Sequence, residues 1–344
     1  MPRPVSMPPL ARTVALRLIA IPPTLLGVSL VVFLLLDLVP LDRAEVELGG
    51  GESTRSIAER AEAVRSLRAH YGMLDPITGE PLPWHTRWFE WLDHALRLDF
   101  APPGQTAAEF RVRFGRALAV SALLGVTSLL VALALGIPLG WWLGRRVGTR
   151  RESLASTTLV GLGALPEFLV ATLLALLFGG PLRELVPVGG LRSPGADGWS
   201  APRQMLDLFA HLALPVLVLA IGPCAWIARL LRASCARTAR QDFVHALRAL
   251  GTPERVIGRC VLRNSLSPLW AFLGVLVPWI LGGAVVVESV FGIPGFGRLS
   301  LDAVRARDPS SILAATLLVA SLVSVGGILG DVLHRQSDRR VVLG

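Results

Sequence analysis

The stretch RQDFVHALRALGTPERVIGRCVLRNSLSP, residues 240–268, is a polar, arginine-rich segment between two hydrophobic ones. It predicts two short helices that are broken at Gly251, Thr252 and Pro253. Gly251 suits the left-handed residue that ends a helix, Thr252 can cap the next helix, and Pro253 fits that helix's first position. One face of the first helix is apolar, because hydrophobic residues recur there at helical spacing: Phe243, Ala246, Leu247 and Leu250.

The rest of the chain is dominated by hydrophobic segments. Of its 344 residues 52% are hydrophobic, and the mean hydropathy is positive. Crossing a bilayer takes about 20 apolar residues. Six segments meet this length: 18–36, 117–143, 154–178, 208–227, 269–287 and 312–329. The first has a long apolar run and no small-residue cleavage pattern after it, which favours a retained anchor over a signal peptide.

The basic charge follows the same segments. The net charge of +9 comes from 34 arginines without a single lysine. More than half of these arginines lie on one side of the predicted membrane, if both termini are cytoplasmic. The positive-inside rule explains this distribution better than a nucleic-acid partner does. The large loop between the first two spans then lies outside the cell membrane. The polar helix pair lies inside, where it offers a docking surface to a soluble partner.

The lack of lysine also excludes a nucleotide site, because a phosphate-binding loop of the GxxxxGK[ST] type needs one. If ATP drives this protein, its hydrolysis belongs to another subunit, which we expect at the helix pair. The three cysteines, Cys224, Cys235 and Cys260, lack metal-ligand spacing and favour small hydrophobic packing.

The outer loop contains two recognisable features. Residues 56–70 have the pattern of an amphipathic helix. An aromatic cluster follows, for which an interfacial belt is favoured over a lip for docking or substrate; its members are Trp84, Trp88, Phe89 and Trp91.

Two acidic residues lie near or within spans, where ionisable groups are functional candidates. Glu167 either lines a pathway or pairs with loop arginines. Glu288 fits a structural role at the outer gate. Three arginines at helical spacing after the break, Arg255, Arg259 and Arg263, suit either lipid headgroups or an ion pair with the docked partner.

Catalytic alternatives are weaker. Gly330 and Asp331 resemble part of the motif of intramembrane aspartyl proteases, but no second span has an acid in mid-membrane to complete a dyad. His211 is the only histidine in a span and lacks a serine turn, which favours a hydrogen-bonded residue at the interface.

Several motifs together resemble the permease subunits of bacterial ATP-binding-cassette (ABC) importers, in the branch that serves dipeptides, oligopeptides and, in some members, nickel. The matching stretches are residues 17–33, 164–168, 211–215, 228–234, 242–268 and 288–297. Some positions depart from the family pattern. His245 replaces a Glu, Leu247 and Leu250 replace an Ala and a basic residue, and Glu167 replaces a small or neutral residue.

The resemblance implies an all-α integral membrane protein with six transmembrane helices, an N-terminal anchor and a five-helix core, and a large extracytoplasmic loop between helices 1 and 2. Residues 1–116 comprise the anchor and loop, 117–334 the permease domain with coupling helices at 240–266, and 335–344 a cytoplasmic tail. The chain would be a multi-pass protein of the bacterial inner membrane with both termini cytoplasmic.

The implied function is peptide transport rather than catalysis. The implied partners are a second permease, two ATPase subunits, an extracytoplasmic binding protein, the peptide and the lipid bilayer, with no nucleic acid. The chain itself would hold no cofactor or metal, since ATP and Mg belong to the ATPases. Nickel or another small solute is the alternative cargo, and an intramembrane protease a remote alternative.

Two groups of site residues follow from the resemblance. The ATPase-coupling residues are Asp242, Phe243, Ala246, Leu247, Leu250, Gly251, Arg263 and Asn264. The pathway or gate residues are Pro166, Glu167, Phe168, Glu288, Phe291, Pro294 and Gly295.

Overall fold

A computed structural model describes residues 9–38, 57–70, 73–75, 78–97, 99–102, 105–182, 184–270 and 284–337. Two compact units are present. The first comprises Met1–Val14, Ala119–Gly297 and Val323–Gly344, and the second comprises Ala15–Leu118 and Arg298–Leu322. Each is described separately.

The described residues are helical throughout, apart from connecting turns and one isolated β-bridge between Leu74 and Pro81. The helices are α1 (Pro9–Asp37), α3 (Ile57–His70), α4 (Trp84–Leu96), α5 (Ala107–Gly144), α6 (Arg150–Ala164), α7 (Glu167–Gly179), η1 (Ala196–Gly198), α8 (Ala201–Thr238), α9 (Asp242–Ala249), α10 (Glu254–Ser265), α12 (Ala284–Val290), α13 (Phe296–Arg305) and α14 (Pro309–Ser337). The helix predicted at 56–70 is confirmed as α3.

Among the described residues, four helices are long and apolar enough to cross a membrane: α1, α5, α8 and α14. The span predicted at 154–178 is not one straight helix. It is divided into α6 and α7, which meet at 88°. The cause is Pro166, because the residue before a proline is driven out of the helical region, and Leu165 is extended with ψ 131°. Counting the bent pair as one span gives five. Most of the segment predicted at 269–287 lies outside the described residues.

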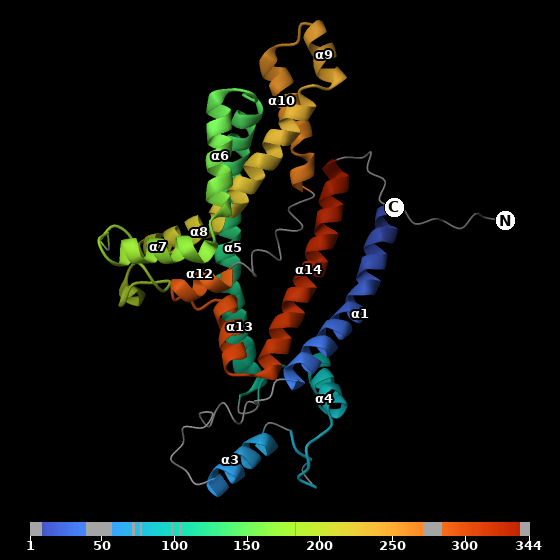
Figure 1. Cartoon of the computed structure of the whole chain (residues 1–344), viewed down its shortest axis with the longest axis vertical. Coiled ribbons are helices and arrows are strands. Elements are labelled where there is room, and N and C mark those ends of the chain that lie inside the picture. Colours follow the sequence, from blue (N-terminus) through green and yellow to red (C-terminus); the bar gives the residue numbers. More distant parts are fainter. Residues whose placement is uncertain are drawn as a thin grey trace, which may run out of the picture. The chain divides into compact units, whose positions relative to one another are not determined.

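Helix α8 is the centre of the first unit, and α6, α7, α10 and α12 all pack against it. Helix α5 also crosses α8 closely, at glycines spaced one turn apart. A Cβ added at Gly140 would lie 2.7 Å from the carbonyl oxygen of Ala228, and one at Gly144 would lie 2.6 Å from the Cβ of Cys235. Small residues thus let the two backbones approach each other. Figure 1 shows α9 and α10 at one end of this unit, beyond α6 and the adjoining end of α8.

The second unit has a smaller core. Trp91 of α4 is buried together with Phe33 of α1 and Leu313 of α14, and Trp88 packs against them. Arg87 forms an ion pair with Asp37. The aromatic cluster predicted as an interfacial belt is therefore divided, because two of its tryptophans pack inward against neighbouring helices. Only its other two members, Trp84 and Phe89, are exposed.

Candidate functional site

The α9–α10 turn has the geometry that the sequence predicts at Gly251, which has φ +72°. The N–H of Thr252 donates to the carbonyl of Leu247, and the N–H of Gly251 donates to the carbonyl of Arg248, each at 3.0 Å. These two bonds form a Schellman motif and satisfy the last carbonyls of α9. The turn is thus held by its own backbone.

The start of α10 differs from the prediction by one residue. Pro253, rather than Thr252, is the residue before the helix, and no side chain caps it. Thr252 is engaged as the second residue of the Schellman motif, so its backbone N–H closes α9. Proline suits this junction because its φ is restricted, and because the N–H that it lacks would have no hydrogen-bond partner in the first turn.

A small core supports the helix pair. Val244 of α9 packs with Ile257 and Val261 of α10, and all three are buried. Trp141 of α5 packs against the same cluster, and its ring lies 3.6 Å from the position of a Cβ on Gly258. The sequence missed Val244, because it adjoins the predicted apolar face rather than lying on it. This core anchors the pair to α5.

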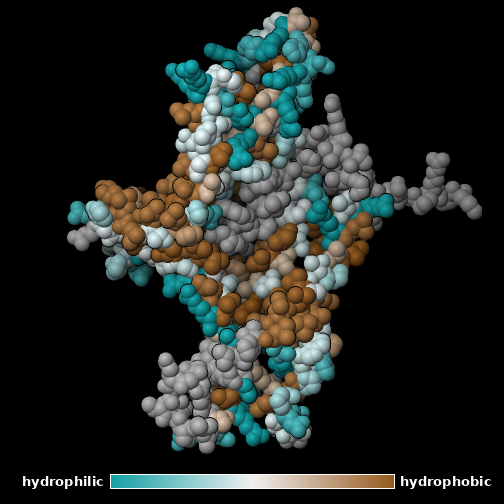
Figure 2. Space-filling model, in the orientation of Figure 1, coloured by the Kyte–Doolittle hydropathy of each residue, from teal (hydrophilic) through white to brown (hydrophobic). Residues whose placement is uncertain are grey.

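The predicted coupling residues lie mostly at the surface of this pair. Leu250 is 80% exposed, and five others are exposed: Asp242, Ala246, Gly251, Arg263 and Asn264. Phe243 and Leu247 are half-buried against the small core. Figure 2 shows hydrophilic residues gathered over this end of the unit. Leu250 thus places an apolar side chain on a largely hydrophilic surface.

One ion pair across the turn was not predicted. The Nε of Arg248 donates to Oε1 of Glu254 at 2.8 Å. This hydrogen bond holds the pKa of Glu254 below its ordinary value, and it raises the pKa of Arg248. Both groups are exposed, so the pair orients the turn more than it stabilises it.

A buried cluster surrounds Glu288, which lies in the last turn of α12. Its side chain is 0% exposed, and Ser121 Oγ of α5 donates to its Oε1. Ser121 Oγ also accepts the N–H of Phe296, at 2.7 Å. A Cβ on Gly295 would overlap the carboxylate group of Glu288. We call Glu288, Ser121, Gly295 and Phe296 the Glu288 latch. It lies in the core, whereas the sequence placed Glu288 at the boundary of a span.

The other gate candidates differ in exposure. Phe291 is buried and its carbonyl accepts the N–H of Gly190 at 2.8 Å, which ties the turn after α12 to the loop before η1. Pro294 is exposed. Pro166 and Phe168 are exposed and Glu167 is half-buried, all at the bend between α6 and α7. Within the described part of the chain, Glu167 has no ion pair with an arginine.

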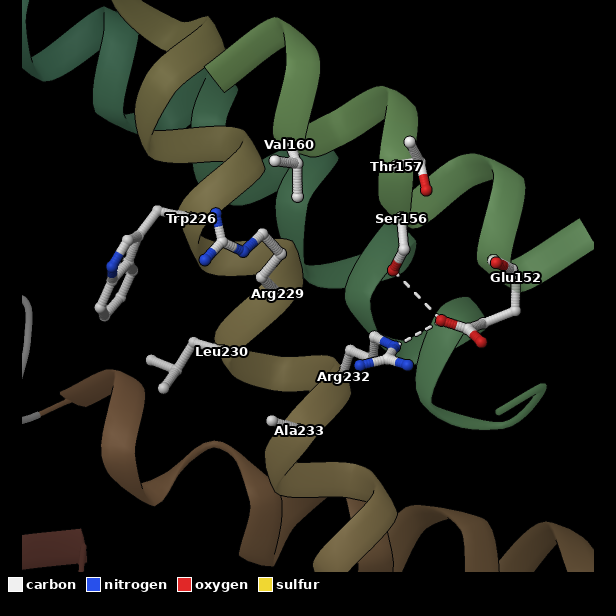
Figure 3. Close-up of a pocket in the computed structure, with 10 residues that line it drawn as sticks. Glu152, Ser156, Thr157, Val160, Trp226, Arg229, Leu230, Arg232 and Ala233 are labelled. Carbon is white, nitrogen blue, oxygen red and sulfur yellow. Dashed lines mark hydrogen bonds and ion pairs between the residues drawn. The ribbon is translucent and has the colours of Figure 1, made fainter. Parts of the chain in front are cut away.

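A polar cleft between α6 and α8 was not predicted. Its volume is about 560 Å³. Glu152 of α6 accepts a hydrogen bond from Arg232 Nε of α8 at 2.5 Å and one from Ser156 Oγ at 3.1 Å (Figure 3). From sequence, Glu152 suggests only a helix cap, since it follows Thr149 by three residues. Its partner on α8 is 80 residues away.

His211 is buried on α8, and its Nδ1 lies 2.8 Å from the carbonyl oxygen of Asp207. Asp207 in turn accepts hydrogen bonds from the N–H and Oγ of Ser193, at 2.9 and 2.6 Å. The serine contacts the carboxylate and not the imidazole, so no nucleophile is activated here. Among the described residues, no group of three or more His, Cys, Asp or Glu side chains could hold a metal ion.

Comparison with known proteins identifies the family. Residues 136–343 match the model of the binding-protein-dependent transport system inner membrane component. The chain belongs to this family of transport permeases.

Individual relatives match nearly the whole chain. A protein of Brucella ovis named as a peptide permease is 33% identical over 327 residues, which cover 92% of this chain and 94% of that protein. The dipeptide transport system permease protein of Bacillus subtilis is 29% identical, with 97% and 99% covered. The oligopeptide transport system permease protein of the same organism is 28% identical, with 93% and 95% covered. The resemblance inferred from the motifs is confirmed, and the chain is a multi-pass membrane permease.

Proposed function

We propose that this chain is one permease subunit of an ABC importer for dipeptides and oligopeptides. A binding protein would deliver the peptide from outside, and two ATPase subunits would drive a pathway that this chain forms with a second permease. The observation that carries the proposal is the exposed α9–α10 pair, supported by full-length similarity to peptide permeases. No cofactor or metal is assigned to the chain, since ATP and Mg would be bound by the ATPases.

The proposed topology has six spans with both termini in the cytoplasm. It counts the bent pair α6–α7 as one span and places another at 269–287, and it leaves the loop between the first two spans outside. The domain boundaries at 116 and 334 belong to the same proposal. Arginines at both ends of the α5–α6 connection and along the last turns of α8 support this orientation.

Coupling would act through the small core of the helix pair. Because Val244, Ile257 and Val261 pack against each other and against Trp141, a force on α9 reaches α5 through packed side chains. Helix α10 also packs on α8. Closure of the ATPases would thus move the two longest helices of the first unit. ATP can drive such a switch only if the nucleotide-bound ATPases favour one state of the permease over the other.

Peptide is the preferred cargo, and nickel or another small solute is the alternative. A bare metal ion would need nitrogen, sulfur or carboxylate ligands gathered in one place. Within the described residues no such group exists. The names of the relatives point to peptides as well.

The test is purification of the tagged chain from its native membranes in mild detergent, followed by reconstitution in liposomes. We expect a second permease and ATPase subunits to co-purify, and the liposomes to accumulate labelled trialanine when ATP and the binding protein are supplied. Accumulation of nickel without peptide uptake would show that the cargo is nickel and not peptide. Recovery of the chain alone, under conditions that keep other such complexes intact, would refute the proposal.

A further inference from the structure

The cleft between α6 and α8 has no role in the coupling surface or in the Glu288 latch. Three hydroxyl-bearing residues of α6 line it, together with apolar and basic residues of α8. The full lining is Glu152, Ser153, Ser156, Thr157, Val160, Trp226, Arg229, Leu230, Arg232 and Ala233. Its volume of about 560 Å³ falls within the size of ordinary ligand pockets.

One of its two arginines is already neutralised. Glu152 is 3% exposed and pairs with Arg232, and its other oxygen accepts the N–H of Gly148 at 3.3 Å. Ser156 donates to the same carboxylate. The pair therefore satisfies itself and adds no net charge to the cleft.

The second arginine, Arg229, has no such partner. Its side chain is exposed, and within the described part of the chain it has neither a hydrogen bond nor an ion pair. Figure 3 shows it on the Trp226 side of the cleft, away from Glu152. The cleft thus has one surplus positive charge. A guanidinium presents paired N–H groups that match the two oxygens of a carboxylate.

The surroundings of Arg229 suit the rest of a short peptide. The indole of Trp226 and the side chains of Val160 and Leu230 provide apolar surface. Ser153 and Thr157 provide hydroxyls for backbone amide and carbonyl groups.

From Arg229 to the start of α9 at Asp242, α8 and its short connection extend about 20 Å at 1.5 Å per residue. In the proposed orientation this places the cleft near the cytoplasmic mouth.

We propose that this cleft is an exit-side subsite in which Arg229 binds the C-terminal carboxylate of the transported peptide. Trp226 lies against the peptide's side chains, and the Glu152–Arg232 pair holds the two walls at a fixed separation. This inference rests on the proposed function, because it takes a peptide as the cargo. A phosphate of an anionic lipid is the competing ligand that the test must separate.

The test measures protection of a cysteine in the cleft. Thr157→Cys is introduced into a chain whose Cys224, Cys235 and Cys260 are replaced by alanine, and the assembled transporter is placed in phosphatidylcholine nanodiscs. The modification rate by a methanethiosulfonate reagent is measured with trialanine and with trialanine amide. We expect trialanine to slow the reaction and its amide to need a concentration about tenfold higher, since a charge-assisted hydrogen bond is lost.

Variants of two arginines sharpen the result. Arg229→Ala and Arg229→Gln should remove the difference between the two peptides, and Arg237→Ala, an exposed arginine of α8 outside the cleft, should keep it. Equal protection by both peptides would overturn the carboxylate site. Slowing by added phosphatidylglycerol without any effect of trialanine would assign the cleft to lipid and also overturn it.

The same complexes in liposomes separate this proposal from the proposed function. Normal trialanine uptake without protection of the introduced thiol in the Thr157→Cys chain would reject the subsite and leave the importer intact. Absence of ATP-dependent trialanine uptake in the unaltered transporter would reject the proposed function itself.

Discussion

Two turns of this permease each contain a residue with unusual solvent exposure, and the two cases are opposite. In the α9–α10 turn, Leu250 is a leucine that is 80% exposed. In the last turn of α12, Glu288 is a glutamate that is 0% exposed. Both positions oppose the ordinary preference of their residue type. In the proposed function the exposed leucine contacts the ATPase, whereas the buried acid is part of the internal structure.

The two turns are also held by different forces. Backbone hydrogen bonds donated by Gly251 and Thr252 close the first turn locally. The second turn depends on Ser121, which lies 167 residues from Glu288 in the sequence. We therefore expect substitutions in the first turn to change coupling and leave the fold intact, and substitutions in the Glu288 latch to change the fold.

The largest effect is expected from Gly295→Ala. The new Cβ would overlap the atoms of the Glu288 carboxylate, which is fully buried and accepts a hydrogen bond from Ser121. Overpacking a core costs about 1–3 kcal/mol, and more where the neighbour cannot yield. The measurement is the melting temperature and yield of the purified chain. Gly222→Ala is the matched control, because a Cβ there meets nothing within 4 Å. Equal melting temperatures for the two variants would contradict the latch.

Ser121→Ala should destabilise the chain by less, about 1–2 kcal/mol, because two buried hydrogen bonds are lost without a steric clash. Ser121→Cys, which keeps a weak donor and acceptor, should lie between the alanine variant and the original chain. Thermal unfolding in detergent measures all three. If Ser121→Ala unfolds like the original chain, the bonds to Glu288 and Phe296 do not support the turn.

Gly251→Pro should break coupling while the bundle stays folded. Proline requires φ near −65° and has no N–H, whereas this position has φ +72° and donates to Arg248. We expect peptide uptake to fall by about tenfold or more, while the melting temperature of the chain changes little. Gly251→Asn, which tolerates the left-handed region, should retain most uptake. Normal uptake by the proline variant would disprove the docking assignment.

Leu250→Glu should weaken assembly with the ATPases and leave the isolated chain as stable as before, within about 0.5 kcal/mol, because the side chain is already in solvent. Co-purification of the ATPases measures the first effect and thermal unfolding the second. Leu185→Glu, at another exposed leucine of the first unit, is the control that should not alter assembly. Assembly that is unchanged by Leu250→Glu would show that this leucine does not touch the ATPases.

The smallest effect concerns pH. The pKa of Glu254 is lowered in the folded chain by Arg248. A group of this kind adds stability that is present above its unfolded pKa and is lost as the pH falls through the lower, folded value. Glu254→Gln should therefore have a slightly lower melting temperature than the original chain at pH 7. This difference should disappear on acidification below pH 4.5, as Glu254 becomes protonated in the original chain. A difference that grows on acidification would have the wrong sign for this ion pair.

The helix pair could be predicted because its signals are local. Gly251 and Pro253 are close together, and the apolar residues of α9 recur at helical spacing. Even so, the start of α10 was displaced by one residue, because Thr252 closes α9 and does not cap α10. Hydrophobic length likewise predicted the long helices, but not the 88° bend that Pro166 produces between α6 and α7.

The latch and the cleft could not be predicted, since both depend on long-range contacts. Nothing in the sequence pairs Ser121 with Glu288, or Glu152 with Arg232. The division of the aromatic cluster has the same cause, because Trp91 is buried against residues of α1 and α14 and Trp88 is partly buried beside it. Residues 338–344 of the predicted cytoplasmic tail lie outside the described residues.

The most direct test of the central claim is a cross-link from Leu250. A photoreactive side chain is placed at position 250 and, in a second chain, at position 185, which is also exposed and which the proposed topology puts on the outer side. After illumination of the assembled transporter, we predict that position 250 joins an ATPase subunit and that position 185 does not. A transporter that hydrolyses ATP while position 250 captures no ATPase, or one in which position 185 captures it, would contradict the account.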